Sequence, residues 1–231
     1  MINLLKGDCL ELLKTLENES IDAIITDPPY NISKTNNFST MRNPRKGIDF
    51  GEWDKEFDET AWIEKAVPKV KKGGNIVVFV GIRQATPIIE KMESLGCEFK
   101  DVIRMVKSNP MPRNRDRRFI VDTEFALYFV KKGGKWTFNR LDEKYERPLI
   151  ETSVTPKSQK VDSGHPTQKP LYAMEWLIER LTNEGDIVLD PFMGSGTTGV
   201  ACQKLDRDFI GCELSDEYFE MAQKRLQYGL N

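Results

Sequence analysis

The sequence predicts an α/β fold: a mostly parallel sheet of seven strands with helices on both faces. Short apolar segments alternate with amphipathic segments along almost the whole chain, which is the pattern of repeated strand and helix units. The alternation is most regular in the last third of the chain. Acidic or glycine-rich loops also follow three of the strands, as expected where a parallel sheet carries a site at the carboxyl ends of its strands.

Strands are expected where a short apolar run is bounded by polar, glycine or proline residues. The first run, INLL, opens the chain, and the second, IDAIIT, ends directly before the sequence DPPY. In chain order, the seven expected strands cover 2–5, 21–26, 75–80, 97–106, 123–130, 186–190 and 207–214.

Helices are expected between these strands, where apolar residues recur with helical spacing. Gly73 and Gly74 are expected to close the second helix, because glycine is favoured just beyond a helix end. In chain order, the six expected helices cover 9–16, 60–70, 84–95, 170–182, 197–205 and 216–227.

The length and composition indicate one soluble globular domain spanning 1–231. A chain of 231 residues with 39% hydrophobic and 30% charged residues can bury one sizeable core. No apolar run approaches the roughly 20 residues of a membrane span, and the N-terminus lacks a basic leader with a cleavage site, so we expect a cytoplasmic protein. With four scattered cysteines and one histidine, we expect reduced thiols and no metal site.

Basic residues are concentrated in two stretches, although the formal net charge is only -2. Prolines and asparagines interrupt the longer stretch, which favours a positioned loop that contacts phosphates over a solvated helix face. The polar stretches at about 33–58 and 135–163 are long for a compact domain, so both are candidate partner-binding loops. The candidate phosphate contacts are Lys34, Arg42, Arg45, Lys46, Arg113, Arg115, Arg117 and Arg118.

The sequence DPFMGSGTTG, at 190–199, follows the sixth expected strand and leads into a helix. Gly194 and Gly196 allow the backbone to approach a ligand closely, and the free N–H groups of a helix N-terminus favour an anion. Glu213 ends the next strand about twenty residues later, where an acid can accept hydrogen bonds from a ribose diol. The loop matches neither G-x-G-x-x-G nor a P-loop, so the pattern indicates a nucleoside cofactor of another kind.

DPPY, DPFMGSGTTG and HPTQKP together resemble motifs of the DNA amino-methyltransferases, in the permuted beta group where the catalytic motif precedes the cofactor loop. The resemblance covers the chain from Asn3 to Leu226. It implies a circularly permuted Rossmann-like methyltransferase fold and S-adenosylmethionine as cofactor. It also implies that the substrate is an exocyclic nitrogen of adenine or cytosine in DNA.

The resemblance assigns roles to individual residues. Asp8 and Cys9 would face the adenine of the cofactor, Glu213 its ribose, and the glycine loop and HPTQKP its methionine part. The implied catalytic residues are Asp27, Pro28, Pro29 and Tyr30. The implied cofactor-binding residues are Asp8, Cys9, Asp27, His165, Thr167, Lys169, Asp190, Pro191, Phe192, Gly194, Ser195, Gly196, Thr197, Thr198 and Glu213.

The chemistry of an aromatic amine explains why DPPY combines these residue types. The lone pair of the amine is delocalised into the ring, so the protein must supply geometry and polarity. If the Asp27 carboxylate and the Pro28 carbonyl each accept one N–H, the lone pair is directed at the methyl donor. Pro29 donates no competing N–H, and Tyr30 can stack on the base. No nucleophilic side chain or strong general base is required.

We therefore expect a sequence-specific DNA methyltransferase that modifies the N6 amino group of adenine, in a restriction-modification system or on its own. The target must be flipped out of the duplex to reach such a site. Phe119, Phe125 and Tyr128 lie on or beside a strand and are expected in the core. The expected partners are double-stranded DNA, with a homodimer and a cognate restriction endonuclease as further possibilities.

Three alternatives remain open at this point. N4-cytosine methylation needs the same amine geometry, although in the resembled family Asp at the first motif position favours adenine and Ser favours cytosine. RNA or a protein glutamine amide could also present a planar amine. A catalytically silent nucleic-acid-binding subunit could keep the fold without the reaction.

Overall fold

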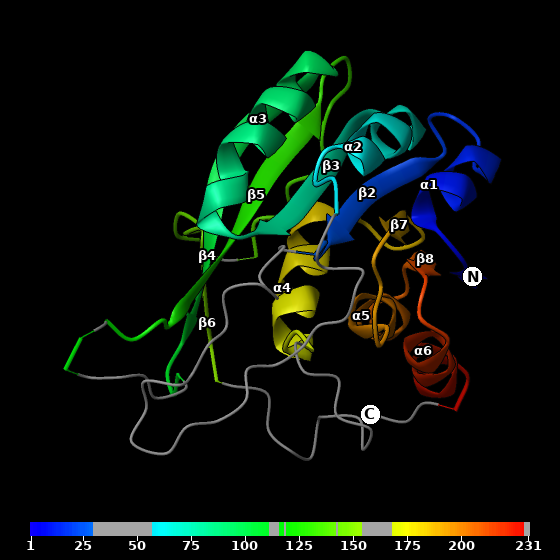
Figure 1. The fold of residues 1–231 in the computed structure, drawn as a ribbon. Helices are drawn as coiled ribbons and strands as arrows, with labels where there is room; N and C mark the ends of the chain where they lie inside the picture. The colour runs from blue at the N-terminus through cyan, green and yellow to red at the C-terminus, as the bar shows by residue number, and fades with distance from the viewer. Residues whose placement is uncertain (30–56, 111–115, 118, 142, 154–167, 229–231) are drawn as a thin grey trace.

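The computed structural model describes residues 1–29, 57–110, 116–117, 119–141, 143–153 and 168–228 (Figure 1). Within these residues, all seven expected strands are present, together with an eighth that the sequence pattern did not predict. The strands are β1 (Ile2–Lys6), β2 (Ile21–Thr26), β3 (Val70–Val80), β4 (Cys97–Lys107), β5 (Thr123–Lys131), β6 (Leu149–Thr152), β7 (Ile187–Asp190) and β8 (Asp208–Glu213).

The eight strands form one sheet in the order β1-β8-β7-β2-β3-β5-β4-β6. Only β5 runs antiparallel, against β3 on one side and β4 on the other, and the remaining pairs are parallel. The expected sheet is therefore confirmed as mostly parallel, but it has eight strands instead of seven. The extra strand, β6, reads LIET, and its two apolar residues do not stand out within the polar stretch 135–163, which was expected to be a loop.

Six helices connect these strands within the described residues. They are α1 (Cys9–Leu12), α2 (Ala61–Ala66), α3 (Ala85–Ser94), α4 (Leu171–Leu181), α5 (Thr197–Lys204) and α6 (Asp216–Tyr228). All six were expected, and α1 and α2 are shorter because each continues into a 3-10 turn, at Leu13–Thr15 and Val67–Lys69. No helix of the described chain is long and apolar enough to cross a membrane.

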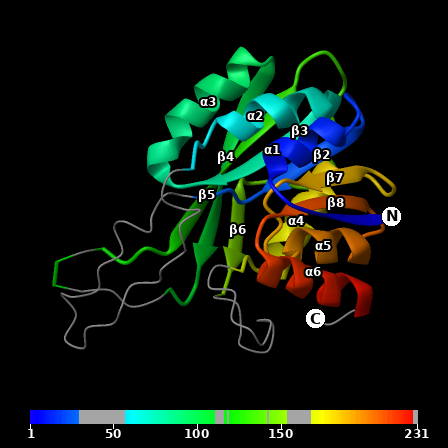
Figure 2. The ribbon, with the colours of Figure 1, turned by 45° about the vertical axis from the view of Figure 1, so that its right-hand side comes forward.

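The helices form two layers, with α1, α2 and α3 on one face of the sheet and α4, α5 and α6 on the other (Figures 1 and 2). Because successive strand residues point to opposite faces, Ile24 and Ile76 pack under the first layer, while Ile25 and Val77 pack under the second. The first and last strands of the chain, β1 and β8, are parallel neighbours, as the permuted order requires.

Gly73 and Gly74 do not close a helix as expected, because both lie within β3, which begins at Val70. Gly73 instead lies where its strand passes close to the backbone around Gly134. A Cβ on Gly73 would lie 2.4 Å from the carbonyl oxygen of Lys135, and one on Gly134 would lie 2.3 Å from that of Lys72. Two backbones therefore cross too closely for any side chain at these positions.

The segment after β5 lies at the end of the sheet opposite the carboxyl ends of the parallel strands. The side chain of Asn75, early in β3, donates to the Thr137 carbonyl at 2.8 Å. The side chain of Asn139 donates to the carbonyls of Glu179 and Thr182 at the end of α4, at 3.0 and 2.9 Å. The start of the stretch 135–163, expected as one partner-binding loop, is thus far from the end of β2.

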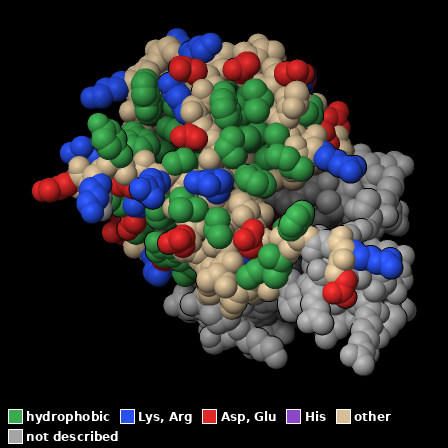
Figure 3. Space-filling model, turned by 90° about the vertical axis from the view of Figure 1, so that its left-hand side faces the viewer, with side chains coloured by type: hydrophobic (Ala, Val, Ile, Leu, Met, Phe, Trp, Pro, Cys, Tyr) green, Lys and Arg blue, Asp and Glu red, His purple; other side chains and the backbone are tan. Residues whose placement is uncertain are grey.

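The core prediction is confirmed for Tyr128, which is 6% exposed and donates to the Asn75 side chain at 2.9 Å. It is wrong for Phe119, which is 97% exposed, because β5 begins only at Thr123 and Phe119 lies in the loop before it. Phe125 is half-buried. Apolar side chains also lie among charged ones on the side of the molecule that carries α3 (Figure 3).

Candidate active site

Four neighbouring strands bring the acidic and glycine-rich motifs to one edge of the sheet. β1, β8, β7 and β2 are consecutive in the strand order. Asp8 follows β1, Glu213 ends β8, Asp190 ends β7 and Asp27 follows β2. The register pairs Lys6 with Glu213, so the ends of neighbouring strands are level. Motifs that are up to about 200 residues apart in the sequence therefore share one site.

The carboxylate of Asp190 is buried and accepts three hydrogen bonds from within the protein. It accepts hydrogen bonds from the hydroxyls of Thr26 (2.7 Å) and Thr198 (2.8 Å) and from the backbone N–H of Phe192 (3.1 Å). Burial raises the pKa of Asp190 to about 6, and these hydrogen bonds oppose the rise. Asp190 thus fixes the glycine loop and the end of β2 relative to each other, instead of offering its side chain to a ligand.

Glu213 is joined to the glycine loop. Its Oε2 accepts from the backbone N–H of Gly194 at 3.0 Å, and its Oε1 accepts from that of Ser215 at 2.7 Å. Burial raises the pKa of Glu213, and the backbone N–H groups oppose the rise. A carboxylate can accept about four hydrogen bonds, so Glu213 keeps acceptor capacity for a hydroxyl group of a ligand. Gly194 and Gly196 have φ angles of 52° and 79°, which favour glycine.

The hydroxyls of the glycine loop point to protein partners. Arg225 of α6 donates to the carbonyl (2.7 Å) and hydroxyl (3.2 Å) of Ser195 and to the hydroxyl of Thr197 (3.1 Å). Burial lowers the pKa of Arg225 to about 10. Ser195, Thr197 and Thr198, expected to contact a cofactor, are each at most 6% exposed, which leaves the loop backbone as the part that can contact one. Sequence reasoning missed Arg225, which lies on a helix with no motif.

The remaining wall of the site is largely apolar. Phe192 contacts the rings of Phe57 and Trp62 edge to face, with centroids 5.4 and 5.6 Å apart. Pro191 is buried.

Asp8 and Cys9 follow β1, the outermost of these four strands, at the same edge of the sheet. Asp8 is exposed and caps α1 by accepting from the backbone N–H of Leu10 at 2.9 Å. Cys9 is buried, and burial raises its thiol pKa to about 12, so it behaves as a small apolar residue. All four cysteines are free and buried.

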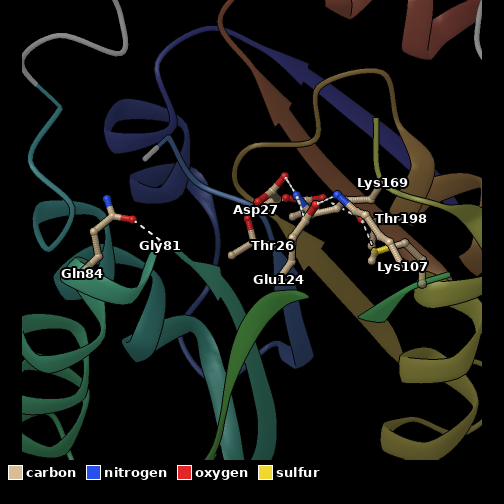
Figure 4. Close-up of polar contacts among 10 residues, drawn as sticks. Thr26, Asp27, Gly81, Gln84, Lys107, Glu124, Lys169 and Thr198 are labelled. Atoms are coloured by element: carbon tan, nitrogen blue, oxygen red, sulfur yellow. Dashed lines mark hydrogen bonds and ion pairs between the residues drawn. The ribbon is translucent and has the colours of Figure 1, made fainter. Parts of the chain in front are cut away.

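The backbone of DPPY is held by Gln84, which lies in the turn before α3. The Gln84 side chain donates from Nε2 to the carbonyl of Pro29 at 3.3 Å. Its Oε1 accepts from the backbone N–H of Gly81 at 3.1 Å (Figure 4). Pro28 is buried, whereas the side chain of Asp27 remains 25% exposed. The motif is therefore fixed from behind, and its acid faces the site.

Lys169, the lysine of HPTQKP, contacts Asp27 of the catalytic motif. Its ammonium donates to Oδ2 of Asp27 and lies 3.2 Å from Oε2 of Glu124, which in turn accepts from Lys107 (Figure 4). Burial alone would raise the pKa of Glu124, but the ammonium groups of Lys169 and Lys107 outweigh it and lower the pKa to about 2. Sequence reasoning missed Glu124 because it is the second residue of the antiparallel strand β5 and belongs to no motif.

Several expected site residues lie outside the described residues. They are Tyr30, His165 and Thr167 of the catalytic and cofactor sets, and Lys34, Arg42, Arg45, Lys46, Arg113, Arg115 and Arg118 of the phosphate-binding set. Arg117 is described and exposed, in the loop between β4 and β5. In the described part of the chain, no three His, Cys, Asp or Glu side chains form a group that could hold a metal ion.

Comparison with known proteins gives a consistent result. A family model of DNA methylases matches residues 21–224. The type II methyltransferase M2.LlaDCHI of Lactococcus lactis subsp. cremoris is 35% identical over 241 residues, which cover 98% of this chain and 89% of the relative. The type II methyltransferase M2.DpnII of Streptococcus pneumoniae is 34% identical, with coverage of 97% and 89%.

Solved structures agree with this result. The crystal structure of the M1.HpyAVI-SAM complex is 43% identical in sequence, with a TM-score of 0.77 over 98% of this chain and 100% of that one. The cytosine-N4-specific PvuII DNA methyltransferase is 20% identical, with a TM-score of 0.75 over 97% and 86%, which shows a shared fold.

Proposed function

Because the chain belongs to the N6/N4 family of DNA methylases, we propose that it methylates the N6 amino group of adenine at a specific sequence in duplex DNA. The observation that carries this proposal is the position of Asp27. It follows β2 directly beside the glycine loop that follows β7, and the hydrogen bond between Thr26 and Asp190 joins the two. An acceptor for an amine and a loop suited to a nucleoside cofactor thus lie in one site.

S-adenosylmethionine is the cofactor of this family, and the residues present fit it. Glu213 has acceptor positions for a ribose diol, and the loop at Gly194 and Gly196 lets the backbone approach a ligand. Asp8 and the apolar wall at Phe192 lie beside them. When bound, the cofactor supplies an electrophilic methyl group.

The chain supplies the geometry for the amine. We propose that the Asp27 carboxylate and the Pro28 carbonyl each accept a hydrogen bond from one N–H of the amine, which directs the nitrogen lone pair into the site. Gln84 fixes this backbone by holding the next carbonyl, that of Pro29. Tyr30 would stack on the base. Asp27 supports adenine over cytosine as the target, because Asp at the first position of this motif favours adenine in the resembled family.

The target base must leave the duplex to reach Asp27, at a cost of a few kcal/mol in stacking and pairing. The segments that follow β2, β4 and β6 all leave from the edge that carries Asp27, since these three strands run in parallel. We propose that DNA binds across this edge, with Arg117 and its basic neighbours on the phosphates.

The relatives named above are type II methyltransferases, and we propose that this chain protects DNA against a cognate restriction endonuclease. Such a protein would act on the DNA of a bacterium or archaeon in the cytoplasm, at the nucleoid. A homodimer remains a further proposal, to be decided by its mass in solution.

Purified protein incubated with tritiated S-adenosylmethionine and mixed-sequence duplex DNA tests the proposal, with the product digested to nucleosides. We expect the label on N6-methyladenine. Label on N4-methylcytosine would support the cytosine alternative. The cytosine-N4-specific PvuII enzyme shares the fold of this chain. Absence of label together with failure to bind S-adenosylmethionine in calorimetry would identify a silent subunit. Labelled RNA or protein in parallel reactions would show a different substrate.

A further inference from the structure

Four charged side chains of alternating sign meet at the catalytic motif, and one of them is its own Asp27 (Figure 4). Asp27 contacts Lys169, Lys169 contacts Glu124, and Glu124 contacts Lys107. They come from four separate parts of the chain: the end of β2, the segment before α4, the start of β5 and the end of β4. Such convergence makes the cluster a property of the fold and not of one motif.

Glu124 reaches this position because β5 is antiparallel. The first residues of β5 lie at the edge where the parallel strands end, and the register places Glu124 beside Met105, two residues before Lys107. The Lys169 side chain is only 10% exposed and its ammonium lies 5.1 Å from the centre of the buried Phe79 ring. In this partly buried setting, ion pairs are stronger than at the surface.

The ammonium of Lys169 is shared between two carboxylates. It lies on Oδ2 of Asp27 and at 3.2 Å from Oε2 of Glu124, and an ammonium has three hydrogens to donate. Lys107 compensates the second carboxylate, so the cluster of two acids and two lysines is neutral. Lys169 therefore does not compensate the charge of Asp27 alone.

This sharing matters because, in the proposed methyl transfer, Asp27 must accept a hydrogen bond from the target amine. A lysine bound to Asp27 alone would compete with the amine for the same carboxylate. Because Glu124 also binds the ammonium of Lys169, Asp27 remains a stronger hydrogen-bond acceptor. When Asp27 binds the amine, the ammonium keeps Glu124 as its partner.

We propose that Glu124 is a positioning residue for methyl transfer, which holds Lys169 between two carboxylates and so keeps Asp27 available to the target amine. The inference rests on the proposed function of the same site. Glu124 acts through Lys169 and does not itself touch the substrate.

The first variant is Glu124→Gln, which keeps the size of the side chain and leaves one acid with two lysines. We expect kcat to fall about tenfold or more, because the ammonium of Lys169 then loses the competing carboxylate of Glu124 and binds Asp27 more strongly. The Kd for S-adenosylmethionine measured by calorimetry should stay within about twofold of the wild type, since no group on the glycine loop changes. Glu98→Gln is the matched control, because Glu98 pairs with Lys100 near the start of β4. Its kcat should equal that of the wild type.

Two double variants separate positioning from charge balance. Glu124→Gln with Lys169→Gln and Glu124→Gln with Lys107→Gln both restore equal numbers of acids and lysines. Only the first removes the competing ammonium from Asp27. At saturating cofactor, we expect the first double variant to be at least about threefold faster than both the second and Glu124→Gln alone.

The outcomes are distinct. A wild type that methylates DNA while Glu124→Gln keeps its kcat, or loses only cofactor affinity, overturns this inference alone. So does a double variant with Lys169→Gln that is no faster than the one with Lys107→Gln, a comparison that stands even if Glu124→Gln does not fold. A wild type that transfers no methyl group to DNA overturns the proposed function and this inference with it.

Discussion

The hydroxyl of Thr26 donates a hydrogen bond of 2.7 Å to Oδ1 of Asp190, from the end of β2 to the end of the neighbouring β7. Thr26 directly precedes Asp27, and Asp190 begins the sequence of the glycine loop. One buried contact thus sets the spacing between the residue that would accept the amine and the loop that would bind the cofactor.

Replacing Thr26 by Val, which has nearly the same shape, should destabilise the fold by about 1–3 kcal/mol at pH 8 and by less at pH 5. Burial raises the pKa of Asp190 from 3.8 to about 6, so folding favours the protonated acid, and the stability that this proton contributes is lost as the pH rises from 3.8 through about 6. Without the hydroxyl, the pKa rises further and the loss is larger. Urea unfolding of both proteins at the two pH values measures the difference.

Thr26→Ser provides the control, because it keeps the hydroxyl and should be close to the wild type at both pH values. An equal loss of stability at pH 5 and pH 8 in Thr26→Val would contradict the role given to the ionised Asp190.

Replacing Arg225 by Met should weaken the binding of S-adenosylmethionine about tenfold, because Ser195 and Thr197 lose their donor and the glycine loop loses its fixed shape. Isothermal calorimetry measures this Kd. Arg207→Met is a matched control: it removes a guanidinium that donates to the carbonyl of Thr182 at 2.9 Å, away from the loop. It should lower stability and leave the Kd unchanged. Unchanged cofactor binding in Arg225→Met would rule out the loop role.

Replacing Gln84 by Glu should lower kcat about tenfold while cofactor affinity stays near that of the wild type. The carboxylate can still accept from Gly81, but it has no N–H to donate to the carbonyl of Pro29. Steady-state kinetics at saturating cofactor measure the effect. Gln203→Glu makes the same replacement on α5, where Gln203 donates to the Leu226 carbonyl at 3.3 Å, and should be active. Equal rates for the two variants would count against a constraint on DPPY.

Replacing Arg117 by Ala should weaken DNA binding and reduce the slope of log K against log salt by about 1, as for the loss of one phosphate contact. Arg117 is exposed in the loop between β4 and β5, so the fold and the cofactor Kd should not change. Fluorescence anisotropy with labelled duplex at several salt concentrations measures the slope. Arg117→Lys keeps the charge and should keep the slope. If Ala and Lys behave alike, this loop does not contact phosphate.

Most of the fold could be predicted from the sequence, because its strands are apolar runs and its helices have a clear period. The exceptions have local causes. β6 has only two apolar residues within a polar stretch, and Gly73 lies where two backbones cross closely, which only the folded chain shows. Phe119 is of a residue type that is common in strands, yet it lies exposed in the loop before β5.

The site was predictable where residues are adjacent in sequence and share a motif. Asp27, Asp190 and Glu213 lie at neighbouring strand ends, which the parallel order dictates. Glu124 and Arg225 were not predictable, since each depends on an antiparallel strand or a helix face that meets the motif only in three dimensions. The same holds for Ser195 and Thr197, whose hydroxyls would have suited a ligand but bind Arg225.

The most direct test of the central claim is mass spectrometry of nucleosides from the DNA of a host that expresses the wild type or the Asp27→Ala variant. We predict N6-methyladenine with the wild type, in one sequence context, and a loss of at least about a hundredfold with Asp27→Ala despite normal folding and cofactor binding. N6-methyladenine at equal levels with both proteins, or methylation found on cytosine instead, would contradict the account.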